Sequence, residues 1–119
     1  MGTARDRVLV VEDDPAVSRL LMRLLERAGR EVLCVGGGAE VAAALETGPF
    51  RAAIVDCDLP GAEDGLGVAR RLRAARPETA VVMTSGRPDN LQRAAEAGFT
   101  RTLPKPFTPA EVEALLASL

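Results

Sequence analysis

The chain has 119 residues, 47% of them hydrophobic and 27% charged, with a net charge of −2, which is typical of one globular domain. This charge gives no electrostatic basis for binding nucleic acid. The sequence has no histidine and two cysteines, which excludes Ser-His and Cys-His hydrolases, His-ligated metal centres and a histidine phosphodonor. No apolar run approaches the length of a membrane span and no secretory signal begins the chain, so we expect a cytoplasmic protein without membrane contact.

Strand and helix patterns alternate along the chain. Short apolar runs typical of buried parallel strands fall at residues 7–11, 31–35, 52–56, 80–84 and 99–103. Helical periodicity falls at residues 15–28, 39–46, 67–75 and 89–97, and again after Pro109. The first helix is the clearest, with Asp14 as its N-cap, Pro15 at its first position and Gly29 at its end. These units predict an α/β fold, a doubly wound parallel sheet with helices on both faces, as a single domain over residues 1–119 without an output domain.

Polar side chains gather at the predicted carboxyl ends of four strands, where open α/β sheets bind ligands. In chain order these residues are Glu12, Asp13 and Asp14, then Asp56 and Asp58, then Thr84 and Ser85, and finally Lys105. Closely packed carboxylates need a cation, and hard oxygen ligands favour Mg²⁺, or Mn²⁺, over a soft metal. Lys105 is the only lysine of the chain and would supply a compact positive charge for phosphate. Together these groups predict a site for phosphoryl transfer.

Each of these residues also has a purely structural explanation. Asp14 is expected to cap a helix, the Thr84 hydroxyl can bond to backbone at a strand end, and Glu12 can be a solvated loop acid. Asp56 is harder to explain in this way, because an ionised carboxylate at the end of an apolar strand is costly without a partner. The combination of groups, rather than any single residue, therefore supports the functional interpretation.

Four sequence blocks resemble the receiver domain of two-component response regulators, in the order and spacing of that family. They are VLVVEDDP at 8–15, IVDCDLPG at 54–61, VVMTSG at 81–86 and LPKPF at 103–107. The resemblance implies a flavodoxin-like fold with five strands in the order 2-1-3-4-5. It also implies a role for each site residue: Asp56 as phosphoacceptor, Asp13 and Asp14 as the acidic pair for Mg²⁺, the main-chain carbonyl of Asp58 as a further ligand, Thr84 as the hydroxyl that meets the phosphoryl group, and Lys105 as its cation. The Lys105–Pro106 bond would be cis.

The implied function is that of a phosphoacceptor domain in a phosphorelay, not of a turnover enzyme on external substrates. A histidine kinase or histidine phosphotransfer protein would donate a phosphoryl group to Asp56, and the added charge would change the surface that a downstream protein reads. Two features depart from the family pattern: Thr102 stands where relatives usually have an aromatic residue, and the loop after Asp56 is one residue longer. The second feature resembles receivers of hybrid histidine kinases.

Two alternatives remain open at this point. The block IVDCDLPG also resembles the DxD block of haloacid dehalogenase-like phosphatases, with Asp56 as nucleophile and Asp58 as general acid. That family places this block on its first strand and a further acidic pair after the lysine, whereas here the acidic residues begin the chain. The other alternative is a receiver-shaped docking module that works without phosphorylation.

Overall fold

The structure is a computed structural model, and it describes residues 7–119. Its elements in chain order are β1 (Arg7–Val11), α1 (Pro15–Arg27), β2 (Glu31–Val35), the 3-10 helix η1 (Gly38–Glu40), α2 (Val41–Leu45), β3 (Ala52–Asp56), α3 (Gly65–Ala75), β4 (Ala80–Ser85), α4 (Pro88–Glu96), β5 (Thr102–Pro104) and α5 (Pro109–Ala117). None of these helices is long and apolar enough to cross a membrane.

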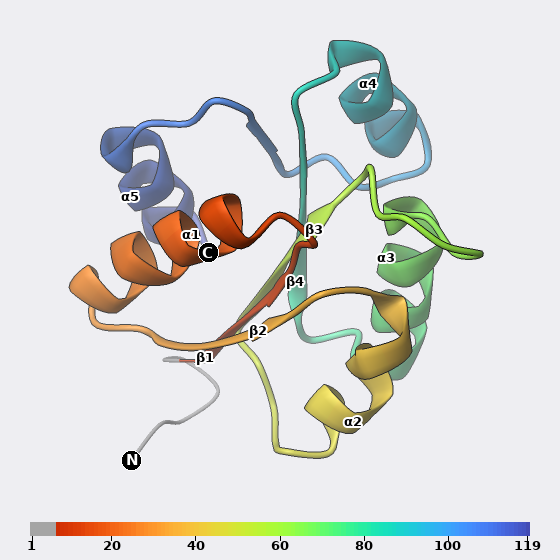
Figure 1. The fold of residues 1–119 in the computed structure, drawn as a ribbon, viewed down its shortest axis with the longest axis horizontal. Helices are drawn as coiled ribbons and strands as arrows, with labels where there is room; N and C mark the ends of the chain where they lie inside the picture. Colours follow the sequence, from red (N-terminus) through yellow and green to blue (C-terminus); the bar gives the residue numbers. More distant parts are fainter. Residues whose placement is uncertain (1–6) are drawn as a thin grey trace.

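The strands form one parallel sheet with the order β2-β1-β3-β4-β5. Helices α1 and α5 lie on one face of the sheet, and α2, α3 and α4 lie on the other (Figure 1). The sequence prediction of a doubly wound, flavodoxin-like α/β sheet is therefore confirmed. In this topology the chain leaves β1 and β3 in opposite directions, so the ends of these two neighbouring strands border the crevice where ligands bind.

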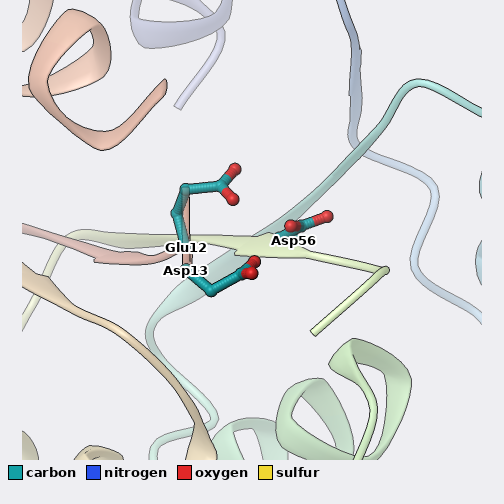
Figure 2. Close-up of side chains that lie close together, drawn as sticks. All are labelled: Glu12, Asp13 and Asp56. Carbon is teal, nitrogen blue, oxygen red and sulfur yellow. The ribbon is translucent and has the colours of Figure 1, made fainter. Parts of the chain in front are cut away.

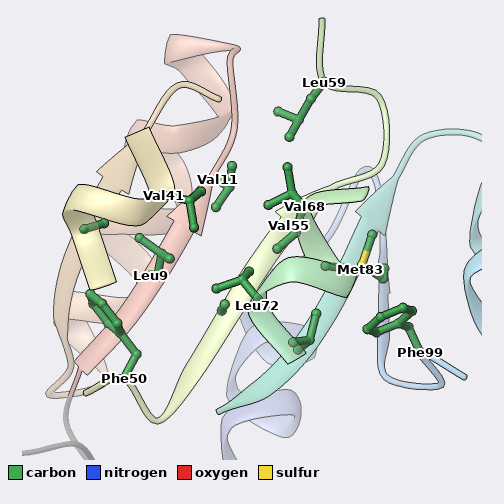
Figure 3. Close-up of a cluster of buried hydrophobic side chains, with 14 of the residues drawn as sticks. Leu9, Val11, Val41, Phe50, Val55, Leu59, Val68, Leu72, Met83 and Phe99 are labelled. Carbon is green, nitrogen blue, oxygen red and sulfur yellow. The ribbon is translucent and has the colours of Figure 1, made fainter. Parts of the chain in front are cut away.

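Alternate residues of the strands enter two separate hydrophobic cores, one on each face of the sheet. On β1, Leu9 and Val11 face the core under α2, α3 and α4, whereas Val8 and Val10 face the core under α1 and α5. Figure 3 shows the first of these cores, in which Phe50, Leu72 and Phe99 fill the space between helices and sheet. Because both faces are covered, the strands are apolar along nearly their whole length, which is why the sequence predicted them well.

Two strand boundaries differ from the prediction. The fifth strand was predicted at 99–103, but it spans Thr102–Pro104. Phe99 is buried, yet its backbone amide donates to the carbonyl of Ala94, so it closes the end of α4 rather than pairing in the sheet. The fourth strand runs one residue further than predicted and ends at Ser85, whose carbonyl accepts from the amide of Lys105 at 2.9 Å. This extra residue brings a second hydroxyl to the rim of the sheet.

Helix α3 begins unusually close to the loop that follows β3. A Cβ added at Gly65 would lie 1.9 Å from the carbonyl oxygen of Asp56 and 2.6 Å from the Cα of Cys57, both of them backbone atoms that cannot rotate away. The amide of Gly65 also donates to the carbonyl of Cys57 at 3.2 Å. Only glycine fits at this position, so α3 and the residues around Asp56 are locked together.

We expect Gly65→Ala to destabilise the domain by about 2–4 kcal/mol, because the added methyl group must push backbone away from backbone. The measurement is chemical denaturation, with Gly37→Ala as the matched control, since a Cβ at Gly37 meets nothing within 4 Å. Equal stability of Gly65→Ala and Gly37→Ala would contradict the close packing described here.

Candidate functional site

Three carboxylates meet at the carboxyl ends of β1 and β3. Glu12 and Asp13 follow β1, Asp56 ends β3, and one ligand oxygen from each lies within 4.8 Å of the other two. Figure 2 shows these three side chains projecting from the two neighbouring strand ends. Glu12 and Asp56 are 4% and 3% exposed, whereas Asp13 is open to solvent. Three oxygen ligands with one open side suit a hard divalent cation that keeps part of its water shell.

The structure does not place Asp14 in this cluster, although the resemblance paired it with Asp13. The Asp14 side chain accepts a hydrogen bond from the amide of Ala16 at 2.9 Å and so caps α1. Glu12, rather than Asp14, lies beside Asp13. The amide of Glu12 donates to the carbonyl of Val35 and so continues the hydrogen bonding of the sheet. The available sequence signal was Pro15, because a proline at the first helical position makes the preceding residue the N-cap and occupies its side chain.

Lys105 is the cation of the site. Its Nζ lies 2.7 Å from Glu12 Oε1 and 3.5 Å from Asp56 Oδ2, so one ammonium balances two buried carboxylates. Burial by itself would lower the pKa of Lys105, but the ion pairs with Glu12 and Asp56 outweigh it, and the pKa is raised. The predicted cis bond between Lys105 and Pro106 is confirmed.

Of the site carboxylates, Glu12 has the least complete hydrogen bonding and charge compensation. Burial raises the pKa of its carboxyl to about 7, with Asp56 adding to the rise and Lys105 opposing it. Its Oε1 is close to the ammonium of Lys105 but accepts no hydrogen bond of good geometry, while Oε2 accepts from the amide of Asp14 at 3.2 Å. The negative charge of this buried carboxylate is not fully compensated, and a divalent cation bound beside it would compensate it.

The Asp56 carboxylate is held in place both by the loop after β3 and by Lys105. The amide of Asp58 donates to Asp56 Oδ1 at 3.0 Å, and the amide of Cys57 donates to the carbonyl of Thr84 at 2.8 Å. Asp56 is also the register partner of Thr84 across β3 and β4. Its carboxylate is thus fixed in position, close to the oxygens of Glu12 and Asp13 and to one cation.

The structure does not bring the Thr84 hydroxyl to the cluster. Thr84 Oγ1 donates to the carbonyl of Leu103 at 2.6 Å, and the residue is 1% exposed, so its proton is committed to β5. The next residue, Ser85, bonds instead to the Asp58 side chain at 2.8 Å, at the rim of the sheet. Sequence reasoning listed Ser85 but assigned it no role.

The structure also shows the surroundings of the two cysteines and of Thr102. Cys34 and Cys57 are half-buried free thiols. Burial, with the nearby carboxylates of Asp58 and Asp56, raises the pKa of Cys57 to about 11, so this thiol beside Asp56 stays protonated and is a poor nucleophile. Thr102 lies on β5 beside a surface hollow of roughly 380 Å³ between β5 and α5, where an aromatic side chain would have room.

Comparison with known proteins shows the family. The model of the response regulator receiver domain matches residues 8–117, so the chain belongs to this family, whose members are phosphoacceptor domains of two-component signalling and not turnover enzymes on external substrates. Receiver domains bind Mg²⁺ in an acidic pocket and interact with histidine kinases or phosphotransfer proteins. The family assignment and the position of the acidic pair before β3 rule against the phosphatase alternative.

The chain matches parts of longer curated proteins. The chain is 39% identical over 115 residues to the transcriptional regulatory protein TcrA of Mycobacterium tuberculosis, covering 95% of this chain and 45% of that protein. It is 36% identical over 119 residues to the sensory/regulatory protein RpfC of Xanthomonas campestris pv. campestris, covering 95% of this chain and 16% of that protein. The chain therefore spans less than half the length of these curated relatives.

Solved structures agree with the fold. A CheY-like receiver domain from Methylobacillus flagellatus superposes with a TM-score of 0.85 at 30% identity, covering 95% of this chain and 97% of that chain. A response regulator from Burkholderia pseudomallei, solved with a phosphorylated aspartic acid, a calcium ion and citrate, superposes with a TM-score of 0.81 at 25% identity, covering 93% of this chain and 66% of that chain.

The raised pKa of Glu12 predicts a pH-dependent stability in metal-free buffer. Its folded-state pKa of about 7 lies above the ordinary 4.5, so its contribution is fully present below pH 4.5 and is lost as the pH rises through 7. With EDTA present, we expect the free energy of unfolding of the wild type to fall by about 1–3 kcal/mol more than that of Glu12→Gln between pH 5 and pH 8.

Urea denaturation at both pH values measures this difference. Glu113→Gln makes the same chemical change at an exposed position of α5 and should keep the pH slope of the wild type. A slope that is identical in Glu12→Gln and the wild type would show that Glu12 is ionised without cost in the folded protein.

Proposed function

We propose that this domain receives a phosphoryl group on Asp56 from the phosphohistidine of a histidine kinase or a histidine phosphotransfer protein. The observation that supports this proposal best is the setting of Asp56, whose buried carboxylate lies between the ammonium of Lys105 and the oxygens of Glu12 and Asp13. A buried carboxylate beside a cation and a metal-binding cluster is arranged to accept negative charge, not only to stabilise the fold.

The chain's own residues would perform most of the reaction by position and charge. A carboxylate oxygen of Asp56 bonds to phosphorus as the bond from phosphorus to the histidine nitrogen breaks, and the electron pair of that bond stays on the imidazole. The amide of Asp58 orients the carboxylate, since it holds Oδ1 at 3.0 Å. Lys105 reaches Asp56 at 3.5 Å and would pair with an oxygen of the transferred phosphoryl group.

Glu12, Asp13 and Asp56 are the residues that would hold Mg²⁺, with the main-chain carbonyl of Asp58 as a further ligand. Their ligand oxygens lie within 4.8 Å of one another, and the incompletely bonded Oε1 of Glu12 is one of the buried oxygens at this site, so the residues present fit a hard divalent cation. When bound, Mg²⁺ supplies positive charge that neutralises the phosphoryl oxygens during transfer.

Phosphorylation would then change the surface that a partner protein reads. An aspartyl phosphate adds about −1.5 to −2 charge at the site and attracts nearby hydroxyl and ammonium groups. We assign the hydroxyl role to Ser85 rather than Thr84, because the Ser85 hydroxyl bonds to the loop that follows Asp56, whereas the Thr84 hydroxyl bonds to Leu103 on β5. The phosphodonors of this family lead us to expect that the domain works in the cytoplasm, and the downstream reader is a protein.

Intact-mass measurement after incubation with acetyl phosphate and Mg²⁺ tests this function. We expect the wild type to gain one phosphoryl group of about 80 Da, and we expect Asp56→Asn, or the wild type in EDTA, to gain nothing. Asp64→Asn is the matched control, because Asp64 is an N-cap outside the cluster and asparagine is also a good cap.

The alternative outcomes separate two explanations. If no adduct forms and no phosphate is released, the domain is a docking module that works unphosphorylated. If phosphate is released without an adduct, Asp56 is an acceptor that hydrolyses rapidly. An adduct on Asp56→Asn would show that another residue accepts the phosphoryl group.

A further inference from the structure

The two edges of the sheet differ in how well they are protected against pairing with a further strand. The sheet order leaves β2 at one edge and β5 at the other. β5 has three residues and ends at Pro104, and a short strand with a proline is a poor template for pairing. β2 has five residues in unbroken register with β1 and contains neither Pro nor Lys. Its one charged residue, Glu31, lies at its start and is paired with Arg7 at 3.2 Å. β2 is therefore the unprotected edge.

The hydrogen bonds to β1 show which backbone groups of β2 point outward. The carbonyl of Val35 accepts from the amide of Glu12, so the backbone of Val35 bonds toward β1. Successive residues of a strand alternate in this direction, so the amides and carbonyls of Val32 and Cys34 point away from β1. Among residues 7–119 no strand lies beyond β2 to bond with them. These groups form a ready template for another strand.

The side chains of this edge are apolar and incompletely covered. Val32 and Cys34 pack against the core under α1 and α5, and Leu33 and Val35 pack against the core on the other face. All four side chains are half-buried, whereas residues 8–11 of the neighbouring β1 are fully buried. Helix α2, which follows β2, has only five residues. A strand added at this edge would bury apolar surface on both faces of the sheet.

The two ends of β2 carry opposite charges. Arg30 directly precedes the strand, and the carboxylate of Glu40 accepts from the amide of Gly36 at 3.1 Å directly after it. An antiparallel pair of β2 strands with Leu33 opposite Leu33 of a second copy sets Arg30 opposite Gly36 of that copy. Arg30 then lies beside the Glu40 carboxylate of the second copy, and twofold symmetry forms this contact twice. A second copy of this chain thus matches the edge in charge as well as in backbone groups.

We propose that β2 pairs antiparallel with β2 of a second copy of this chain, so that the two sheets join into one continuous sheet about a twofold axis at Leu33. Val32 exchanges both of its backbone hydrogen bonds with Cys34 of the second copy, and Leu33 forms the non-hydrogen-bonded pair on the axis. The proposal concerns association of the domain and does not depend on phosphorylation of Asp56. Its tests therefore use the chain without Mg²⁺ or a phosphoryl donor.

Sedimentation equilibrium tests whether the chain associates. We expect a reversible dimer with a Kd of about 10–100 μM, which is weak because one short strand makes a small interface. A chain that stays monomeric up to about 1 mM would overturn the proposal.

A proline at the edge tests whether the outward backbone groups carry the dimer. Val32→Pro removes an outward amide but none of the bonds to β1, and proline is tolerated at such edge positions. We expect it to weaken the dimer at least about tenfold, because a ladder bond is lost and the ring faces the partner strand. Val32→Ile keeps the amide and the β-branched side chain and should stay within about threefold of the wild type. Circular dichroism checks that both variants fold, and an unchanged Kd in folded Val32→Pro contradicts the pairing.

Disulfide trapping tests the register and leaves the backbone amides in place. In a Cys34→Ala, Cys57→Ala background, Leu33→Cys sets two thiols across the twofold axis, where the Cα atoms lie about 4.5 Å apart, within disulfide range. Val35→Cys lies on the same face of β2 but opposite Glu31 of the second copy, so it meets no thiol. With oxidised glutathione we expect a covalent dimer from Leu33→Cys and none from Val35→Cys. Equal trapping of both variants, or none of either, would overturn the register.

Exchange of the two charges tests the choice of a second copy as the partner. Arg30→Glu and Glu40→Arg should each weaken the dimer about threefold to tenfold, because each symmetric dimer loses two exposed ion pairs and gains two like-charge contacts. The variant with both substitutions restores opposite charges across the interface, so its Kd should return to within about threefold of the wild type. A double variant as weak as the two single effects combined would count against this interface.

Discussion

The balance of charge between one ammonium and two buried carboxylates is the interaction on which the rest of the site depends. Glu12 and Asp56 come from neighbouring strands, and without Lys105 their burial would be prohibitively costly. One positive charge does not fully compensate two carboxylates, and burial, with the charge of Asp56 added, makes Glu12 hold its proton more tightly than an exposed glutamate does. The resting site thus has an unfavourable excess of buried negative charge. A bound cation would reduce this excess and would also support the transfer of a phosphoryl group to the site.

Backbone geometry gives this charge arrangement its precision. Gly65 allows α3 to touch the loop after β3, the amide of Asp58 fixes the carboxylate of Asp56, and the amide of Lys105 bonds to the end of β4. These contacts involve the loop after β3 and the segment after β5, and each is anchored to the carboxyl end of a strand. The sheet therefore sets the relative positions of the charged groups.

Much of the architecture could be read from the sequence because both faces of the sheet are covered. Strands such as β3 are continuously apolar and end abruptly at a charged residue, so Asp56 and its position at the rim were predictable. Two details of the site could not be settled from the sequence. Asp14 was expected both to cap α1 and to bind metal; in the structure its Oδ1 caps α1, and Glu12 rather than Asp14 lies together with Asp13 and Asp56. The sequence alone does not show which of the adjacent hydroxyls of Thr84 and Ser85 contacts the loop after β3. The answer depends on where β4 ends and on the hydrogen bond from Thr84 to Leu103.

The scarcity of lysine has a practical chemical consequence. Fourteen of the fifteen basic side chains are arginine, so Lys105 is the only side-chain amine in the molecule. Its ion pairs keep it protonated and therefore weakly nucleophilic at neutral pH, so acylating reagents should find it slow to react in the folded domain. Forced or enzymatic acetylation would have a single side-chain target, and it would erase the cation of the site in one step. Amine coupling to a surface or dye, routine for most proteins, would for this one either modify the chain terminus or strike the centre of its chemistry.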